Sequence, residues 1–234
     1  MKLSIVIPFY NEENMIQKMY DALVAEVNKI TKAEFEIIFI NDGSKDRTFE
    51  KMLAIADSDS RVKYISFSRN FGKEAGTIAG LEYATGEAVI LMDGDLQHPP
   101  ALLPQMIEAY EEGYDVGSAR RTRTGEKPHR TFLAKHFYRL ANKMMDIELM
   151  DGVSEFRLFS RKAVRAILSL QEYNRFSKGI FSWIGFKEKV IEYENQVRTV
   201  GETKYSLKFS LNYAIQGILS FNDKPLRVCI NFGL

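Results

Sequence analysis

The chain has 234 residues, 45% of them hydrophobic and 27% charged, which is the composition of a globular protein with room for one sizeable α/β domain. Its 32 lysines and arginines balance 31 aspartates and glutamates, so a net charge of +1 provides no global attraction to nucleic acid. The single cysteine, Cys229, excludes an internal disulfide framework and suits a reducing cytoplasm, and the three histidines lack zinc-binding spacing.

Apolar strand-like runs alternate with helical patterns through the first half of the chain. The predicted strands are residues 3–8, 35–40, 62–67, 88–92 and 115–118, with amphipathic stretches between them. Alternation of this kind predicts βαβ units and a mostly parallel sheet flanked by helices in a single domain. Near residue 120 the pattern changes to a basic and less periodic second half.

Polar residues follow three of these strands at the point where each strand ends. They are residues 9–13 after the first strand, 41–46 after the second and 93–97 after the fourth. Open α/β folds bind ligands at the carboxyl edge of the sheet, where these loops converge. The carboxylates of Asp93 and Asp95 at such an edge favour Mg²⁺ or Mn²⁺ held together with substrate phosphates, and thus an enzyme acting on a phosphorylated sugar donor. The alternative for the aspartate run is an Asx turn that caps the strand.

The spacing of the glycines excludes two other phosphate-binding motifs. Gly72, Gly76 and Gly80 recur at every fourth residue, which lines one face of a helix and predicts close helix packing instead of a G-x-G-x-x-G turn. The chain also lacks the G-x-x-x-x-G-K-[ST] loop of nucleotidases.

Taken together, these segments resemble the family 2 glycosyltransferases of GT-A fold. The resemblance rests on residues 4–12, 40–46, 69–73 and 92–100, and in the second half on 117–120, 155–158, 175–179 and 200–206. It is closest to the polyprenyl-phosphate glycosyltransferases, which include dolichol-phosphate mannose synthases and bactoprenol glucosyltransferases. The resemblance implies transfer of a sugar from a nucleotide diphosphate to a polyprenol phosphate, with inversion at the sugar.

The resemblance also implies a donor site. Asp42 matches the position that recognises the base, where a carboxylate accepts the imide N–H of uracil, and Pro8, Tyr10 and Glu12 match the opposite wall of that pocket. For Asp42 the structural alternative is an Asx turn with Gly43 and Ser44.

The metal site is implied in the same way. Asp93 matches a carboxylate facing the ribose and the metal, whereas Asp95 and Gln97 match direct ligands of Mg²⁺ or Mn²⁺. The metal would neutralise charge on the departing diphosphate.

The acceptor side is implied by a basic patch between residues 120 and 139, where seven arginines and lysines face one glutamate. Arg120 and Arg130 match an acceptor loop, and Arg198 and Lys204 match later phosphate contacts. Guanidinium groups would suppress repulsion between a lipid phosphate and the donor diphosphate. A solvated loop, or a patch attracted to anionic lipid headgroups, is the alternative for this basic segment.

Glu155 departs from the family pattern, which usually has aspartate before Phe-Arg-Leu. That position is assigned to a catalytic base or to a group that orients the acceptor. A phosphate acceptor has a second pKa near 6 and is largely anionic at neutral pH, so we expect Glu155 to orient the acceptor rather than remove a proton. An ordinary ion pair with Arg157 or another neighbour is the alternative.

The C-terminal stretch, residues 205–221, is amphipathic, with apolar residues at helical spacing. We expect a catalytic domain over residues 1–204 and a juxtamembrane segment over residues 205–234. This segment would lie in the plane of the membrane interface and end before transmembrane helices. The alternative is that it packs on the protein's own core.

The sequence thus predicts a metal-dependent enzyme that transfers glucose or N-acetylglucosamine from a UDP-sugar to undecaprenyl phosphate at the cytoplasmic membrane face. Its partners would be the donor, the lipid phosphate and the membrane surface, and no nucleic acid is expected. The sequence does not decide whether the protein forms a homo-oligomer. The alternatives are a family 2 enzyme that extends a cell-surface glycan, which would have no need of a phosphate clamp, and a non-catalytic sensor of sugar nucleotides.

Overall fold

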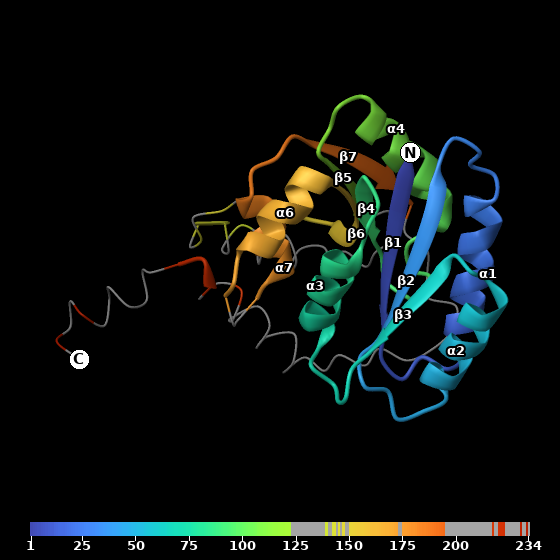
Figure 1. Ribbon diagram of the computed structural model, residues 1–234. Helices are drawn as coiled ribbons and strands as arrows, with labels where there is room; N and C mark the ends of the chain where they lie inside the picture. Colours follow the sequence, from blue (N-terminus) through green and yellow to red (C-terminus); the bar gives the residue numbers. More distant parts are fainter. Residues whose placement is uncertain are drawn as a thin grey trace.

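The computed structural model describes residues 1–122, 150–172 and 175–194 of the chain, together with the single positions 139, 142, 143, 145, 147, 217, 220, 221, 222, 230 and 233. Within these ranges the chain forms one seven-stranded sheet with helices on both faces (Figure 1). The predicted α/β class is confirmed.

The first half of the chain alternates strands and helices as its apolar pattern predicts. The elements are β1 (Lys2–Phe9), α1 (Ile16–Val27), β2 (Glu34–Asn41), α2 (Thr48–Ser58), β3 (Val62–Ser66), α3 (Lys73–Tyr83), β4 (Ala88–Leu91), the 3-10 turn η1 (Pro100–Leu102), α4 (Leu103–Glu111) and β5 (Val116–Arg121). Strand β1 pairs in parallel with β2 and β4, and β2 pairs in parallel with β3. These strands read as nearly continuous apolar runs because helices cover both faces of the sheet.

The second half contributes the antiparallel part of the sheet. It adds β6 (Val153–Ser160), α6 (Arg161–Ser169), α7 (Ser177–Trp183) and β7 (Glu188–Tyr193). The strand order is β3-β2-β1-β4-β6-β5-β7, and β6 runs antiparallel to both of its neighbours, β4 and β5. This insertion places residues of β6 beside the carboxyl end of β4.

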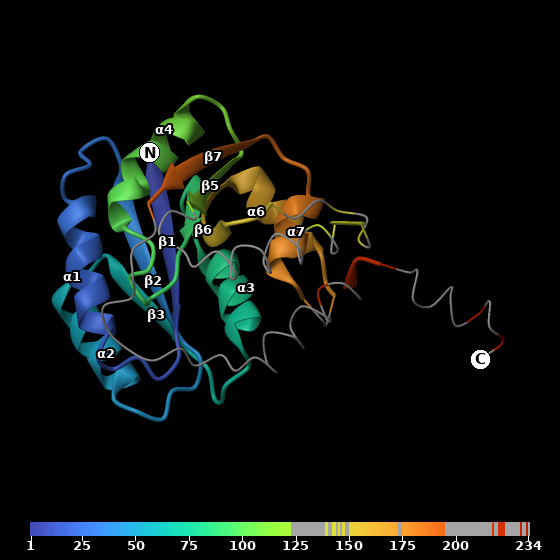
Figure 2. The same ribbon diagram turned by 180° about the vertical axis from the view of Figure 1, so that it is seen from behind.

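Two helical layers enclose the sheet (Figures 1 and 2). One apolar cluster joins β1 and β2 to α1, α2 and α4, and includes Phe9, Met19, Phe39, Met52 and Met106. A second cluster joins the other face to α3, α6 and α7, and includes Val6, Ile38, Leu81, Val164 and Phe181. The strand side chains alternate between these clusters, as the two-residue period of a strand requires.

Gly76 and Gly80 bring α3 close to the sheet, which confirms the predicted packing at these two positions but not at Gly72, where an added Cβ would meet nothing within 4 Å. A Cβ added at Gly76 would lie 3.4 Å from the Cβ of Pro8, and one added at Gly80 would overlap the side chain of Val6. Gly72 precedes the helix with φ of 94°, a left-handed conformation that glycine adopts without cost.

Most of the predicted juxtamembrane segment, residues 205–234, lies outside the described residues. Gly217 is buried, and Phe221 packs in the apolar cluster of α3, α6 and α7. A Cβ at Gly179 of α7 would overlap the Phe221 ring, so at this point the segment packs on the protein's own core. Among the described residues, no helix is both long and apolar enough to cross a membrane. The domain boundary at residue 204 stays a prediction.

Candidate functional site

The loops after β1, β2, β3 and β4 lie together at the carboxyl edge of the parallel strands, the lower edge of the molecule in Figure 1. The loops after β1 and β2 are joined by hydrogen bonds. The backbone N–H of Asn11 donates to Ser44 Oγ over 3.0 Å, and the N–H of Lys45 donates to Asn11 Oδ1 over 2.8 Å. Asn11 adopts φ of 51°, which is rare outside glycine but tolerated by asparagine.

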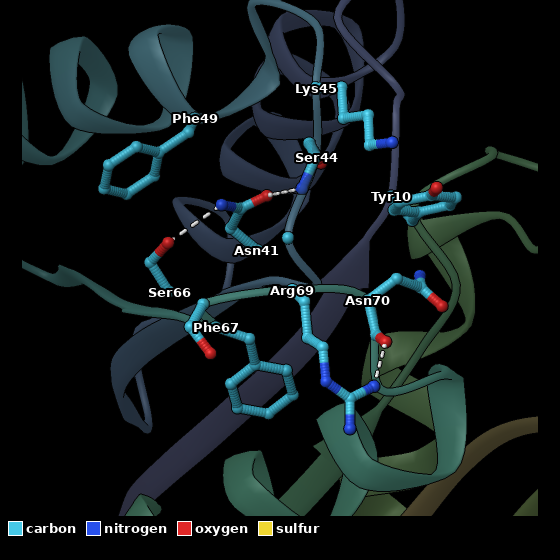
Figure 3. Close-up of a pocket in the computed structure, with 11 residues that line it drawn as sticks. Tyr10, Asn41, Ser44, Lys45, Phe49, Ser66, Phe67, Arg69 and Asn70 are labelled. Carbon is cyan, nitrogen blue, oxygen red and sulfur yellow. Dashed lines mark hydrogen bonds between the residues drawn. The ribbon is translucent and has the colours of Figure 1, made fainter.

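A pocket of about 570 Å³ opens at this edge (Figure 3). Its size falls within the range of small-molecule sites. Aromatic rings, hydroxyl groups and two basic side chains line it, from Tyr10, Asn41, Gly43, Ser44, Lys45, Phe49, Ser66, Phe67, Ser68, Arg69 and Asn70. Of the residues predicted to bind the donor, only Tyr10 lines this pocket, where its side chain is 37% exposed.

Asn41 organises the floor of the pocket. Its amide donates to Ser66 Oγ over 2.8 Å, and its Oδ1 accepts the backbone N–H of Ser44 over 3.0 Å, both drawn in Figure 3. The backbone N–H of Ser44, which an Asx turn at Asp42 would use, is therefore bound by the side chain of the preceding residue, Asn41. On the β3 side of the pocket, the guanidinium of Arg69 lies 3.9 Å from the centre of the Phe71 ring.

Asp42 is buried and holds the loop that leads into α3. Its carboxylate accepts the backbone N–H of Phe71 over 2.7 Å, the N–H of Gly72 over 3.0 Å and the side-chain amide of Asn70 over 2.8 Å. Burial raises the pKa of Asp42, and the two backbone donors offset only part of that rise. A carboxylate has about four acceptor sites, so three donors leave little capacity for a base. Its predicted contact with uracil stays a prediction.

Pro8 and Glu12 make structural contacts at the same edge. Pro8 faces Gly76 of α3. Glu12 donates its backbone N–H to Thr48 Oγ1 over 2.8 Å, and its carbonyl accepts the N–H groups of Met15 and Ile16 where α1 begins. These contacts fix the β1 loop, and the donor contacts of both residues stay predictions.

The acidic loop after β4 carries the three predicted metal ligands. Asp95 accepts the backbone N–H of Gln97 over 3.1 Å. Leu96, between them, adopts φ of 57°, a costly conformation for a bulky side chain, and packs against the core on the α1 side. Such strain persists only where packing enforces it, and it is concentrated at functional sites.

The donor set of this loop fits a metal that arrives with phosphate ligands. Within the described ranges, no three His, Cys, Asp or Glu side chains converge so as to hold a metal ion by themselves. Asp93, Asp95 and Gln97 nevertheless provide two carboxylates and an amide oxygen on one loop. Mg²⁺ takes only one or two carboxylates when substrate phosphates and water complete its octahedron, so this partial set is adequate.

Lys73 links the acidic loop to β6, a contact that the sequence does not reveal. Its Nζ lies 2.5 Å from Asp93 Oδ1 and 2.5 Å from Glu155 Oε2. Burial alone would lower the pKa of Lys73, but the two carboxylates raise it well above its ordinary value. Burial would likewise raise the pKa of Asp93, but Lys73 and His98 hold it well below its usual range. Lys73 and Asp93 are therefore both charged near neutral pH.

His98 and Tyr193 support Asp93 from its other side. His98 Nε2 lies 3.7 Å from Asp93 Oδ2, and His98 Nδ1 lies 2.5 Å from the hydroxyl of Tyr193 at the end of β7. Burial raises the pKa of Tyr193. Three residues of this site were not predicted from the sequence: Lys73, His98 and Tyr193. One signal was available for Lys73, because the helix dipole disfavours a lysine in the first turn of a helix.

Among the predicted acceptor residues, the structure describes Glu155 and Arg120. Glu155 forms an ion pair with Lys73, so the alternative of an ion pair with a neighbour is present, although the neighbour is not Arg157. Arg157 lies 3.3 Å from Glu188 instead. The orienting role of Glu155 stays a prediction. Arg120 on β5 pairs with Glu192 of β7 over 2.6 Å, and both side chains are exposed. Arg130, Arg198 and Lys204 lie outside the described residues, so the phosphate clamp stays a prediction.

Comparisons with known proteins agree on one family. Residues 4–168 match the family model described as Glycosyl transferase family 2. The chain is 50% identical over 232 residues to a putative glycosyltransferase, CsbB, of Bacillus subtilis strain 168, covering 99% of this chain and 70% of that protein. It is 42% identical over 235 residues to the prophage bactoprenol glucosyl transferase homolog of Escherichia coli K12, covering 100% of this chain and 76% of that protein.

Solved structures share the fold at low identity. The mannosyltransferase PcManGT from Pyrobaculum calidifontis, in complex with GDP-Man and Mn²⁺, aligns with a TM-score of 0.59 at 17% identity over 81% of this chain and 54% of that chain. Glucosyl-3-phosphoglycerate synthase from Mycobacterium tuberculosis, in complex with Mn²⁺ and UDP-glucose, aligns with a TM-score of 0.57 at 18% identity over 93% of this chain and 76% of that chain. At these identities the likeness establishes the GT-A-like fold alone.

Proposed function

The chain belongs to glycosyl transferase family 2, and we propose that it transfers glucose from UDP-glucose to a polyprenyl phosphate at the cytoplasmic face of the membrane. The observation that carries this proposal is a pocket of about 570 Å³ at the same sheet edge as an acidic loop, in a chain 42% identical to a bactoprenol glucosyl transferase homolog. UDP-N-acetylglucosamine is the second donor to consider.

The donor's base and ribose occupy the pocket between the β1, β2 and β3 loops. Tyr10 and Phe49 offer aromatic faces, while Lys45 and Arg69 supply positive charge for an anionic donor. Asp42 shapes this pocket by holding the loop through Gly72. The fold itself does not choose the base, because solved structures of this fold hold both GDP-Man and UDP-glucose, so the preference for UDP rests on the sequence resemblance.

Asp93, Asp95 and Gln97 would hold Mg²⁺ or Mn²⁺ together with the donor diphosphate. Manganese in the complexes of two proteins of this fold supports a divalent ion. When bound, the ion supplies a Lewis acid that neutralises charge on the departing UDP. The chain's own contribution is the strained turn at Leu96, which fixes the two ligands on either side of it.

The acceptor phosphate is its own nucleophile. A phosphate oxygen attacks the anomeric carbon, the bond from that carbon to the β-phosphate oxygen breaks, and UDP leaves with the electron pair; in-line attack inverts the anomeric centre. Because this acceptor is already anionic at neutral pH, the step needs no strong base. Glu155, fixed by Lys73 beside the acidic loop, would orient the acceptor. Arg120 and Arg130 would contact its phosphate, as the sequence resemblance implies. Arg198 and Lys204 add further phosphate contacts.

The membrane assignment follows from the acceptor, since a polyprenyl chain is held in the bilayer. The basic segment and the amphipathic residues 205–221 would supply the two features that attract a protein to an anionic lipid surface, although Phe221, at the end of this stretch, packs on the protein's own core.

A panel of radiolabelled nucleotide sugars tests this proposal. The protein is incubated with undecaprenyl phosphate and labelled UDP-glucose, UDP-N-acetylglucosamine or GDP-mannose, and the lipid is then extracted. We expect UDP-glucose to label the lipid at least tenfold faster than GDP-mannose does. No lipid label from any donor would contradict the proposal, and label from UDP-N-acetylglucosamine alone would correct the sugar while leaving the acceptor in place.

A further inference from the structure

Lys73 occupies an unusual position for a lysine. It is the first residue of α3, where the unpaired N–H groups and the helix dipole disfavour a cation. Its location is therefore not explained by helix capping. Two carboxylates, Asp93 and Glu155, hold its ammonium at 2.5 Å each, and its side chain remains about one-third exposed.

These ion pairs connect two parts of the site that are far apart in sequence. Asp93 belongs to the acidic loop after β4, and Glu155 belongs to the antiparallel strand β6. The ammonium is the cation that neutralises both carboxylates, because among the described residues no other lysine or arginine forms a salt bridge with either one. His98 faces the second oxygen of Asp93 at 3.7 Å, so both oxygens of this carboxylate are engaged.

A divalent ion that uses Asp93 must therefore compete with Lys73. Two cations on one carboxylate oxygen repel each other strongly, since the interaction of charges a few ångström apart is weakly screened in a partly buried site. A nucleotide diphosphate changes this balance because it brings negative charge of its own, to which the ammonium can turn. The metal and the nucleotide would then bind together far better than the metal binds alone.

We propose that Lys73 is a positioning residue that keeps free divalent metal away from Asp93 and so makes metal binding depend on the nucleotide donor. This inference rests on the proposed function, because it takes the acidic loop as the metal–donor site. Its consequence is a site that assembles as a metal–nucleotide complex, with Glu155 already fixed on the acceptor side.

Electron paramagnetic resonance of free Mn²⁺ measures this coupling without any transfer reaction. Mn²⁺ is titrated into the protein with and without saturating UDP, for the wild type and for Lys73→Met, Lys73→Gln and Lys73→Arg. The glutamine variant donates hydrogen bonds to the carboxylates without charge, so the test does not rest on an apolar replacement alone. Lys18→Met, which removes an exposed lysine of α1, is the control for net charge.

We expect the wild type to bind Mn²⁺ at least tenfold more tightly with UDP than without it. Lys73→Met and Lys73→Gln should bind Mn²⁺ alone at least tenfold more tightly than the wild type, so that the effect of UDP shrinks. Lys73→Arg and Lys18→Met should resemble the wild type. Because coupling is reciprocal, calorimetry of UDP binding with and without Mn²⁺ should report the same loss of coupling in the two neutral variants.

Two different results separate this inference from the function on which it rests. If UDP still promotes Mn²⁺ binding but the two neutral variants bind Mn²⁺ alone no more tightly than the wild type, Lys73 does not exclude the metal and the inference is wrong. If UDP leaves Mn²⁺ binding unchanged in every protein and Asp95→Asn does not change Mn²⁺ binding either, the acidic loop is not a metal–donor site. The metal role in the proposed function is then wrong.

Discussion

Asp93 and Asp95 are two residues apart but lie in different surroundings. Asp93 is engaged by Lys73 and His98, whereas the contact of Asp95 within its own loop is with the backbone of Gln97. The two carboxylates therefore serve different purposes: Asp93 ties the loop to its neighbours, and Asp95 would bind the metal–diphosphate complex without first separating from a lysine.

Replacing Asp95 tests the metal role directly. Asp95→Asn removes a charged ligand with little change of shape, so transfer should fall at least a hundredfold while the circular dichroism spectrum and the urea midpoint stay unchanged. Asp57→Asn, at an exposed position on α2, is the matched control and should retain full activity. Undiminished transfer by Asp95→Asn, or by the wild type in excess chelator, would rule out a required metal at this loop.

Glu155 differs from the usual family aspartate by one methylene. Its Oε2 is held in place by an ion pair with Lys73, and we propose that the carboxylate orients the acceptor. Glu155→Asp should therefore retain substantial activity, and Glu155→Gln should lower the rate by a similar factor at every pH above the acceptor's pKa near 6. The measurement is a pair of pH–rate profiles with a soluble short-chain polyprenyl phosphate. A wild-type rate that rises through a group missing from Glu155→Gln would instead identify a general base.

At the scale of elements, α3 is held against β1 by its glycines. Substitution by alanine in a helix interior is worth about 1 kcal/mol in favour of folding, whereas overpacking costs about 1–3 kcal/mol. At Gly80 the added methyl would overlap Val6, and at Gly76 it would make ordinary contact with Pro8. Gly80→Ala should therefore lower the free energy of unfolding, and Gly76→Ala should leave it unchanged or raise it, in urea titrations. Equal effects at the two positions would refute this packing account.

Glu36 joins the opposite end of the sheet. Its buried carboxylate accepts from Ser4 Oγ over 2.5 Å, from Lys63 Nζ over 2.8 Å and from Thr85. Burial alone would raise the pKa of Glu36, but these donors hold it well below its ordinary value of 4.5. The carboxylate therefore contributes its full stability above that value and loses it as the pH falls towards the lowered folded-state pKa.

This pH dependence gives a prediction for the free energy of unfolding. Glu36→Gln should lower the free energy of unfolding by about 1.5–3 kcal/mol at pH 7, because hydrogen bonds to a charged group are lost. The difference from wild type should shrink as the pH falls below 4.5. Urea titrations at pH 7 and pH 3 measure it, with the exposed Glu34→Gln as the control. A difference of the same size at both pH values would contradict the assigned ionisation.

At the scale of the whole molecule, the parallel strands were predictable. The runs at 3–8, 35–40 and 88–92 correspond to β1, β2 and β4 within two residues at each end, because strands buried on both faces must be apolar throughout. Strand β6 was recognised only as the motif around Glu155. Its place between β4 and β5 depends on pairing between residues that are remote in sequence, such as Ile90 with Leu158, and no local pattern encodes it.

The site was predictable to a similar extent. Parallel topology predicts that the acidic loop and the loops after β1 and β2 meet at one edge of the sheet. The structure places these loops together at that edge. The pairing of Lys73 with Asp93 and Glu155 did not follow, because it depends on where β6 enters the sheet. The pocket residues of the β3 loop, Arg69 and Asn70, were seen only as a family motif, since their position depends on the buried carboxylate of Asp42.

The proposed reaction is defined by its acceptor, a lipid phosphate. The most direct test compares transfer of labelled glucose from UDP-glucose to undecaprenyl phosphate, to undecaprenol and to a soluble oligosaccharide, under identical detergent and Mn²⁺ conditions. We expect label in undecaprenyl phosphate, with transfer to the two hydroxyl acceptors at least a hundredfold slower, because neither presents an anionic nucleophile. Transfer to the oligosaccharide at a rate equal to or above that of the lipid phosphate would contradict this expectation and identify an enzyme that extends glycans.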